Sequence, residues 1–401
     1  MYQLLSGLAV VEASSFVASP TAGLYLAQMG AEVIRIDQAG GGPDFRRWPQ
    51  APGGASLYWE NLNRAKKSVA LDLTQREGRE LMQRLCASTG QLITNFPAEG
   101  FLAHDRLAAL RPDLVTVRVM GQANGGPALD YTVNSAVGIP GMTGPAELGD
   151  APVNHVLPAW DLLTGAYAAF ALLAAVQHRA ATGAGQEVRI PLADVAIGTV
   201  ANLGMLAEAM QAGHDRPRLG NSVYGAFGRD FVTRDGKRLM LMAITPRQWS
   251  GLVEVLGIAA EIAAIEAARG VSFETDEGLR FAHRDALFPL VEARVGEWDY
   301  AALETALDAR GCCFGGYSTL TEAARDPELV TQNPMFGRTD NPSGLDYPAP
   351  GPFASLPGQP RAAPRAAPRL GEHTRDMLSR LLQLSDAEIG DLADRGIVAL
   401  G

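Results

Sequence analysis

The sequence predicts an α/β protein that combines a large, Rossmann-like domain with a smaller α+β domain. From Leu8 to about Gly121, apolar strands alternate with amphipathic helices, which is typical of a parallel sheet built from crossover units. An Asp-Gly turn between apolar runs then predicts a β-hairpin within Ala226–Ile244. The segment Pro342–Arg369 is rich in Pro and Ala, so we expect an extended connector that crosses between domains.

Five strands and two helices are expected in the first part of the chain. The strands are Leu8–Glu12, Glu32–Asp37, Ser68–Leu73, Gln91–Asn95 and Leu114–Met120, and the helices are Thr21–Gln28 and Arg76–Ala87. A long apolar helix begins near Asp161. A strand at Glu187–Ile190 and an apolar helix from Asp194 to about Ala212 follow it.

The smaller domain, about residues 220–330, contains the hairpin and further helical segments. These are Arg247–Leu256, Asp276–Arg294 and Tyr300–Asp308. Two terminal helices are expected at Thr374–Leu384 and Ser385–Arg395. Ser385 and Glu388 have the spacing of a capping box at the start of the second one.

Composition restricts the possible partners. At 401 residues and 47% apolar composition, the chain is typical of a soluble globular protein with a large core. Its net charge of -10 argues against nucleic acid or an anionic membrane as the main partner, so a phosphate-bearing ligand would need a local basic pocket. The longest apolar run, Leu162–Val176, is too short to span a bilayer and predicts a buried helix.

Cysteine usage and the N-terminus indicate the compartment. Three cysteines form no disulfide framework and lack metal-ligand spacing, so we expect a reducing cytoplasm and no metal site. Cys312 and Cys313, the adjacent pair, are expected to be structural. The N-terminal stretch has no basic residue before its apolar run and predicts a strand rather than a signal peptide.

Several common ligand motifs are missing. No G-x-G-x-x-G follows the first strand, and Gly40-Gly41-Gly42 after the second opens no clear helix, so NAD binding is weakly supported. A Walker phosphate loop, a zinc motif and a G-x-S-x-G elbow are also missing. Carboxylates, histidines and backbone amides are therefore the available chemical groups.

Asp161 stands between a loop and a helix that should be buried. It could be the N-cap of that helix, or a nucleophile that attacks a reactive acyl carbon at the edge of a water-poor pocket. Asp130 could cap a turn after a Gly-Gly-Pro loop, and His155 could be a base or a polar anchor. The pairs Arg46-Arg47 and Lys66-Lys67 could hold phosphates or a carboxylate, or could be solvated loop charges.

Several segments, taken in order from about residue 8 to 374, resemble the class III CoA-transferases, which include formyl-CoA transferase, carnitine CoA-transferase and α-methylacyl-CoA racemase. They are LAVVEASSFVASPTAGLYLAQMGAEVIRID, NLNRAKKSVALDL, LITNF, the helix beginning at Asp161, TGAGQEVRIPLADVAI and APRLGEHT. Each segment is a weak match alone, and the ordered set is specific.

The resemblance implies that Asp161 is the catalytic aspartate and that coenzyme A (CoA) enters as part of an acyl-CoA substrate, with no tightly bound cofactor. It implies that backbone and apolar surfaces along the CoA path come from Val17, Ala18, Leu71, Asn95 and Phe96. It also implies an interlocked homodimer whose large domain is made of both chain ends, residues 1–215 and 335–401. An Arg common in the family after the NF motif is missing here, and Gln38 stands where some members have Arg, so contacts to adenine and phosphate stay open.

Racemases of this family carry a His immediately before the aspartate that corresponds to Asp130, and this chain has Leu129 there. Because Leu cannot accept a proton, the substitution favours a transferase over a racemase. Longer strings, GGGPDFRRWP, ITNFPAEG, DYTVN, VNHVLPAWDLLTG and YGAFGRDF, are similar to members that move CoA between the C1 and C4 carboxyls of mesaconate, a C5 dicarboxylate.

That narrower resemblance implies intramolecular transfer through an aspartyl-CoA thioester, with the released diacid turning inside the pocket. Candidates for holding its free carboxylate are Arg46 or Arg47, His155 and the amides of Gly40–Gly42, while Asp130 would orient or repel neighbouring groups. Two alternatives stay open. One is an intermolecular transferase that uses succinyl-CoA or a similar donor with a dicarboxylate, and the other is a non-catalytic CoA-binding protein.

Overall fold

The computed structural model describes all residues from Met1 to Gly401. The chain divides into two compact units. The large unit comprises residues 1–138, 155–211 and 325–401, and the small unit comprises residues 139–154 and 212–324. Residues 139–154 were predicted to belong to the large domain. They pack instead within the small unit, where Arg218 donates to the carbonyl of Ala151 at 2.6 Å and Gly220 N–H to that of Gly144 at 3.1 Å.

A seven-stranded sheet with the order β12-β3-β2-β1-β4-β5-β6 forms the centre of the large unit. The strands are β1 (Ala9–Ala13), β2 (Glu32–Gln38), β3 (Lys67–Leu71), β4 (Gln91–Thr94), β5 (Val115–Met120), β6 (Gln186–Pro191) and β12 (Val398–Ala399). The first six run parallel, which confirms the predicted strands, and have the strand order of Rossmann folds. The last strand pairs antiparallel with β3, so the sheet is mixed.

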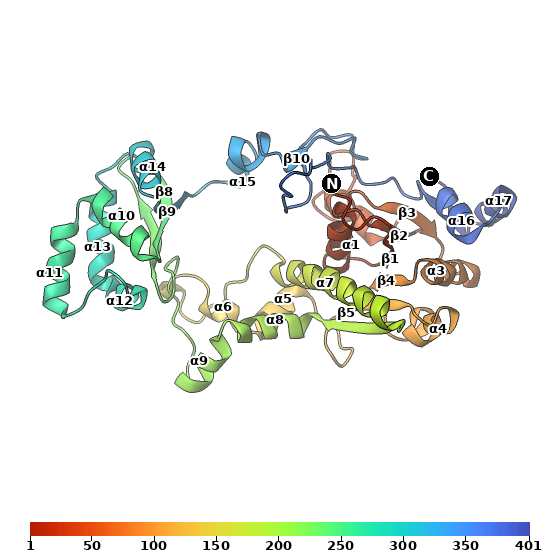
Figure 1. The fold of residues 1–401 in the computed structure, drawn as a ribbon, viewed down its shortest axis with the longest axis horizontal. Coiled ribbons are helices and arrows are strands. Elements are labelled where there is room, and N and C mark those ends of the chain that lie inside the picture. The colour runs from red at the N-terminus through yellow and green to blue at the C-terminus, as the bar shows by residue number, and fades with distance from the viewer. The chain divides into compact units, whose positions relative to one another are not determined.

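Two helical layers cover the sheet (Figure 1). Helices α1 (Ala18–Gln28) and α7 (Ala159–Thr182) share one apolar core with the strands. On the opposite face lie α3 (Arg76–Thr89), α4 (His104–Leu110), α16 (Thr374–Leu382) and α17 (Asp386–Asp394). The capping box predicted from Ser385 and Glu388 is present at the start of α17, which confirms it.

The apolar helix α7 has 24 residues and is long and apolar enough, by length and composition, to cross a membrane. It is longer than the apolar run Leu162–Val176 from which it was predicted. One face packs on α1, where a Cβ at Gly165 would lie 2.6 Å from the carbonyl oxygen of Ala18. The close approach of the two helices therefore needs a glycine. The predicted burial holds for this face, while Leu163, Tyr167 and Phe170 on the other face are exposed.

The remaining elements of the large unit are short. They are α2 (Leu57–Leu62), α5 (Asp130–Ala136), α8 (Leu192–Asn202), α9 (Met205–Ala212), the single turns Pro43–Arg46, Gly100–Leu102 and Pro327–Thr331, and the paired strands β10 (Phe336–Gly337) and β11 (Ala349–Pro350). The helix expected from Asp194 to Ala212 is broken into α8 and α9, which meet at 69°. Gly204, with φ +76°, takes the left-handed conformation at the break.

The Pro-rich segment 342–369 is extended, as predicted, but it does not cross between the units. It lies wholly within the large unit. Ala362 N–H bonds to the carbonyl of Met1, and Ala65 N–H to that of Ala366, each at 3.0 Å. The connector thus fastens the C-terminal part of the chain to the N-terminal part.

The small unit has a three-stranded antiparallel sheet of β7 (Phe227–Val232), β8 (Arg238–Ala243) and β9 (Cys313–Gly316). The predicted hairpin across the Asp-Gly turn is confirmed, and β9 was not predicted. The helices are α6 (Ile139–Met142), α10 (Pro246–Leu256), α11 (Ala259–Arg269), α12 (Glu277–Ala282), α13 (Arg284–Val295), α14 (Tyr300–Ala309) and α15 (Leu320–Ala323), with a single turn at Ala146–Leu148. The helix predicted at Asp276–Arg294 is interrupted at His283.

Candidate active site

The strand order reverses between β1 and β4, and hydrogen bonds join the loops that follow these two strands. The side chain of Asn95 accepts from Ser15 N–H at 3.2 Å and donates to the Ser15 carbonyl at 3.0 Å. The Thr94 hydroxyl donates to the Ala13 carbonyl at 2.8 Å. In open α/β sheets this is the place where ligands bind.

The residues expected along the CoA path lie at the carboxyl ends of β1, β3 and β4. Val17 and Ala18 begin α1 and are almost wholly buried. Phe96 is partly buried, with its ring centroid 6.4 Å from that of Phe101. Leu71 is fully buried in the core beneath α3 and α16, so its side chain is not exposed to a ligand in this structure. The side chain of Asn95 is engaged in holding the loop after β1.

Asp161 is the third residue of α7, and the interpretation of Asp161 as the N-cap is wrong. The N-cap position is Pro158, whose side chain makes no capping bond. The cap comes instead from Asp130, at the start of α5. Its Oδ2 accepts from Trp160 N–H at 2.7 Å and from Asp161 N–H at 3.0 Å. A buried carboxylate thus satisfies two of the free amides at the N-terminus of the helix and interacts favourably with its dipole.

The second oxygen of Asp130 holds His155. The Asp130 Oδ1 to His155 Nε2 distance is 2.6 Å. The imidazole ring lies near two aromatic rings, with centroid distances of 5.7 Å to Tyr131 and 6.4 Å to Trp160. The structure therefore brings together three predicted site residues, Asp161, Asp130 and His155, at the first turn of one helix.

The surroundings of Asp161 make its carboxylate a high-energy anion. Its pKa is raised from 3.8 to about 6, mainly by burial and also by the negative charge of Asp130, while the guanidinium of Arg47 lowers it. A pKa displaced by burial and a like charge is typical of functional carboxylates. Near pH 7 the group is mostly ionised and poorly solvated, the state that a carboxylate nucleophile requires.

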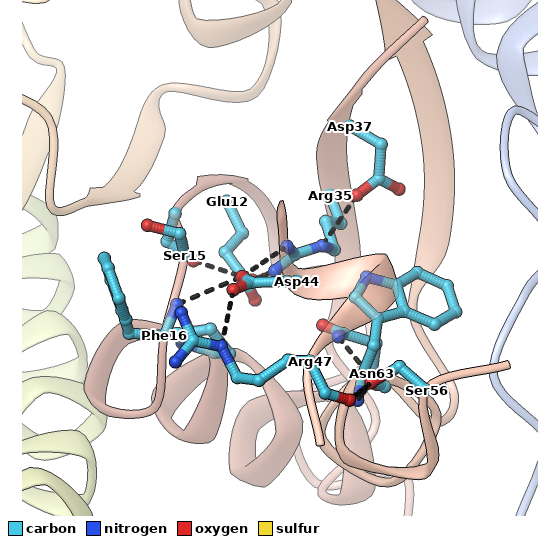
Figure 2. A network of polar contacts seen from close by, with 12 residues as sticks. Glu12, Ser15, Phe16, Arg35, Asp37, Asp44, Arg47, Ser56 and Asn63 are labelled. Atoms are coloured by element: carbon cyan, nitrogen blue, oxygen red, sulfur yellow. Dashed lines mark hydrogen bonds and ion pairs between the residues drawn. The ribbon is translucent and has the colours of Figure 1, made fainter. Parts of the chain in front are cut away.

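Of the two predicted arginines, Arg47 lies near Asp161 and Arg46 is exposed. The Arg47 guanidinium lies 4.5 Å from the ring centroid of Phe16 and 5.4 Å from that of Tyr58. Its Nε donates to Asp44 Oδ1 at 3.2 Å (Figure 2). Gly40 is exposed, and Gly41 forms a tight turn with φ +76°.

Behind Arg47 lies a buried network of charges. Arg35 pairs with Glu12 at 2.7 Å and with Asp37 at 2.9 Å, and its Nη2 lies 3.7 Å from Asp44 Oδ2 (Figure 2). Lys66 is buried and lies 2.7 Å from Glu12 Oε2, and burial lowers its pKa to about 8. Lys66 is therefore committed to this network and does not hold a phosphate.

Three residues near the site were not predicted from the sequence: Glu12, Asp44 and Trp160. The Trp160 Nε1–H donates to Asn134 Oδ1 at 3.0 Å. Asp44 carried a signal, because it stands between the glycine-rich turn and the two arginines. Glu12 carried a weaker one, since an acidic residue within a run of buried apolar residues needs a partner.

Comparison with known proteins places this arrangement in a family. A model of CoA-transferase family III matches residues 5–374. The chain belongs to this family. It is 45% identical to 2-methylfumaryl-CoA isomerase of Chloroflexus aurantiacus over 100% of this chain and 98% of that protein. It is 28% identical to succinate–glutarate CoA-transferase of Agrobacterium fabrum, over 94% of this chain and 95% of that one.

Solved structures agree with the family assignment. A CAIB/BAIF family protein from Brucella suis superimposes with a TM-score of 0.76 at 27% identity, covering 95% of this chain and 100% of that one. The family works on CoA thioesters, so this chain is an enzyme whose coenzyme arrives with its substrate.

Proposed function

We propose that the enzyme moves CoA between the C1 and C4 carboxyls of mesaconate, converting 2-methylfumaryl-CoA to 3-methylfumaryl-CoA through a thioester on Asp161. The observation that carries this proposal is the full-length, 45% identity to a 2-methylfumaryl-CoA isomerase. The geometry supports it, because Asp161 combines burial with a pKa of about 6. A carboxylate of this kind is ionised at neutral pH and gains stability when it forms a neutral acyl bond.

The first half of the reaction loads CoA onto the enzyme. An Asp161 oxygen attacks the C1 carbonyl carbon, and the C–S bond breaks to give a mixed anhydride and the CoA thiolate. The thiolate then attacks the Asp161 carbonyl carbon. Mesaconate leaves as the dianion, and Asp161 carries the thioester.

The second half reverses these steps at the other end of the diacid. The C4 carboxylate attacks the Asp161 thioester and expels the thiolate, which then attacks the C4 carbonyl carbon of the new anhydride and frees the Asp161 carboxylate. No proton is gained or lost over the cycle. The reaction therefore needs a pocket that retains a dianion while it turns.

We assign the free carboxylate of the substrate to Arg47. This guanidinium is the cation whose field acts on Asp161, and it is held over Phe16 and Tyr58. A dianion released beside Asp161 and Asp130 needs a positive charge to remain there. The exposed Arg46 and the amides of Gly40–Gly42 are less favoured candidates.

Asp130 and His155 act on the nucleophile through the backbone in this proposal. Asp130 fixes the first turn of α7, and His155 fixes Asp130. The ends of β1 and β4, with Val17, Ala18 and Phe96, would form the path of the pantetheine arm. Asn95 would shape that path from the loop it holds.

The test is incubation of the purified enzyme with 2-methylfumaryl-CoA alone. Formation of 3-methylfumaryl-CoA without an added acid, and trapping of an Asp161 hydroxamate with hydroxylamine, are expected. Asp161→Ala serves as the control and should form neither product. Full activity in that variant would show that the mechanism is wrong.

The Agrobacterium relative favours a second candidate, transfer of CoA from succinyl-CoA or a similar donor to a separate dicarboxylate. The same incubation separates the two. Strict dependence on an added acid would establish intermolecular transfer. A CoA-binding protein without activity would give neither product nor hydroxamate.

We further propose that the enzyme is a cytoplasmic, interlocked homodimer. The exposed face of α7 carries Leu163, Tyr167 and Phe170 at helical spacing, and a partner subunit would cover them. The three cysteines are free thiols, which suits a reducing compartment. Light scattering should give twice the chain mass, and a monomer would refute the dimer.

A further inference from the structure

The Asp44 carboxylate lies against three groups, one of which is the Arg47 guanidinium. Its Oδ2 accepts from Phe16 N–H at 3.0 Å and lies 3.7 Å from Arg35 Nη2. Its Oδ1 accepts from Arg47 Nε at 3.2 Å. The Asp44 side chain is 7% exposed, and Figure 2 shows it between the other three residues.

One of these contacts holds a strained backbone. Phe16 has φ +68°, the left-handed conformation that costs a residue with a side chain about 1–2 kcal/mol. The loop around Phe16 is fixed on one side by Asn95, through Ser15, and on the other by Asp44. In that position the Phe16 ring lies against the Arg47 guanidinium.

We propose that Asp44 is a positioning residue of the transfer reaction, which fixes the Arg47 guanidinium for the substrate carboxylate by holding both Arg47 and the Phe16 ring beside it, and which neutralises part of the Arg47 charge. The part that concerns the substrate rests on the function proposed above. Asp44 acts through Arg47, since it makes no contact with Asp161.

The charge balance around Asp44 explains how it can do this without cancelling Arg47. Three carboxylates, Glu12, Asp37 and Asp44, face three cations, Arg35, Lys66 and Arg47. Arg35 lies against all three carboxylates, so Asp44 shares its negative charge between Arg35 and Arg47. Part of the positive charge of Arg47 is thus left to act on Asp161, where it lowers the pKa of the carboxyl group.

The groups that face Asp161 are few. Asp130 and Arg47 act on it directly, the Tyr58 hydroxyl lies within the field of Asp161, Arg47 and Asp44, and His155 is bound to Asp130. Removing the charge of Asp44 leaves Arg47 with no neutralising partner but Asp161. The pKa of Asp161 should therefore fall, because more of the Arg47 charge acts on it. The bond from Arg47 Nε that fixes the guanidinium for the substrate carboxylate is lost, and this should raise KM.

Asp44→Asn tests this, because Asn keeps an oxygen that can accept from Phe16 N–H and removes the charge. The matched control is Asp37→Asn, which takes a carboxylate from the same buried Arg35 and touches neither Phe16 nor Arg47. Asp161 is titrated by ¹³C NMR in Asp-labelled enzyme, with Asp161→Asn to assign the signal. This readout does not depend on turnover, so failure of the proposed reaction and failure of the Asp44 proposal are separate results.

The expected fall in the pKa of Asp161 is about 0.5–1 in Asp44→Asn and about zero in Asp37→Asn. In the double variant Asp44→Asn/Arg47→Gln, the pKa should equal that of Arg47→Gln alone, because Asp44 acts through Arg47. With 2-methylfumaryl-CoA as substrate, KM should rise roughly tenfold in Asp44→Asn, and the acid limb of the pH profile should move to lower pH.

Equal pKa values in wild type and Asp44→Asn would overturn the proposal. So would equal shifts in Asp44→Asn and Asp37→Asn, or an additive double variant. Asp44→Ser, which keeps an acceptor without a charge, replaces Asp44→Asn in every comparison if circular dichroism shows that the Asn variant does not fold.

Discussion

Replacing Asp161 by Asn should make the protein more stable while it abolishes the reaction. The pKa of Asp161 is about 6 in the folded protein and 3.8 for an ordinary Asp, a difference worth ~3 kcal/mol when the group is ionised in both states. Because Asp161 is partly exposed, solvent screening reduces this to about 1–2 kcal/mol. The folded state binds this proton more tightly than the unfolded state does. The destabilisation is therefore fully present above pH 6 and disappears as the pH falls towards 4.

Thermal unfolding of wild type and Asp161→Asn at pH 8 and pH 4 measures the difference. The midpoint should rise by about 1–3 °C at pH 8 and should be nearly unchanged at pH 4, since the shift per kcal/mol is small for a chain of 401 residues. Asp194→Asn is the matched control, since Asp194 also lies in the first turn of a helix, α8. It should lose about 0.3–1 kcal/mol with the helix dipole and gain nothing. A less stable Asp161→Asn at pH 8, or a gain that persists at pH 4, would refute the reasoning.

Three further predictions follow from contacts around the site. In Asp130→Asn the pKa of Asp161 should fall, because a like charge is removed. The acid limb of the pH profile of kcat/KM should then move from near pH 6 to lower pH. An unmoved limb would show that it does not report the ionisation of Asp161. Gly23→Ala places a Cβ 1.8 Å from Glu12 Oε2 and should break the buried Lys66–Glu12 ion pair, which lowers the free energy of unfolding in urea by roughly 3–5 kcal/mol. The control Gly198→Ala, whose Cβ would lie in open space on α8, should be neutral or slightly stabilising. Arg118→Met leaves the carbonyls of Phe96 and Leu102 without their guanidinium donor and leaves Glu187 with Arg189 alone, so stability should fall by roughly 3 kcal/mol. KM for the CoA thioester should also rise, and an unchanged KM would show that Arg118 does not hold the loop after β4 in its binding position.

Local pattern was enough to predict the strands of the large sheet. β2 and β5, for example, differ from the expected ranges by a single residue, because buried parallel strands read as short apolar runs between turn signals. The break between α8 and α9 was missed. Apolar periodicity continues through it, and the left-handed Gly204 that bends the chain has no distinctive neighbours.

The sequence indicated the main residue of the site but not the contacts that surround it. Family motifs indicated Asp161, and its position before a buried helix suggested a cap. The true cap, Asp130, is 31 residues away from Asp161, and no local rule links the two. The sequence left Lys66 as either a phosphate ligand or a solvated loop charge, because its partner, Glu12, lies much earlier in the chain, in β1. Pairings across the sheet decide which charges are free for chemistry, and a single sequence does not contain them.

Because Asp130, and not Asp161, caps α7, the carboxylate of Asp161 should be more reactive. A capping Asp gives its oxygens to backbone N–H groups, which stabilises the anion and makes it a weaker nucleophile. In α7 the Asp130 carboxylate takes those N–H bonds and places a second negative charge beside the Asp161 carboxylate, which makes no capping bond of its own. Asp161 thus keeps the position of a first-turn residue without the stabilisation that usually comes with it. Exchanging the two roles would yield an equally well-capped helix and a poorer nucleophile, so in the proposed chemistry Asp130 supports the reactivity of Asp161 without forming a bond to the substrate.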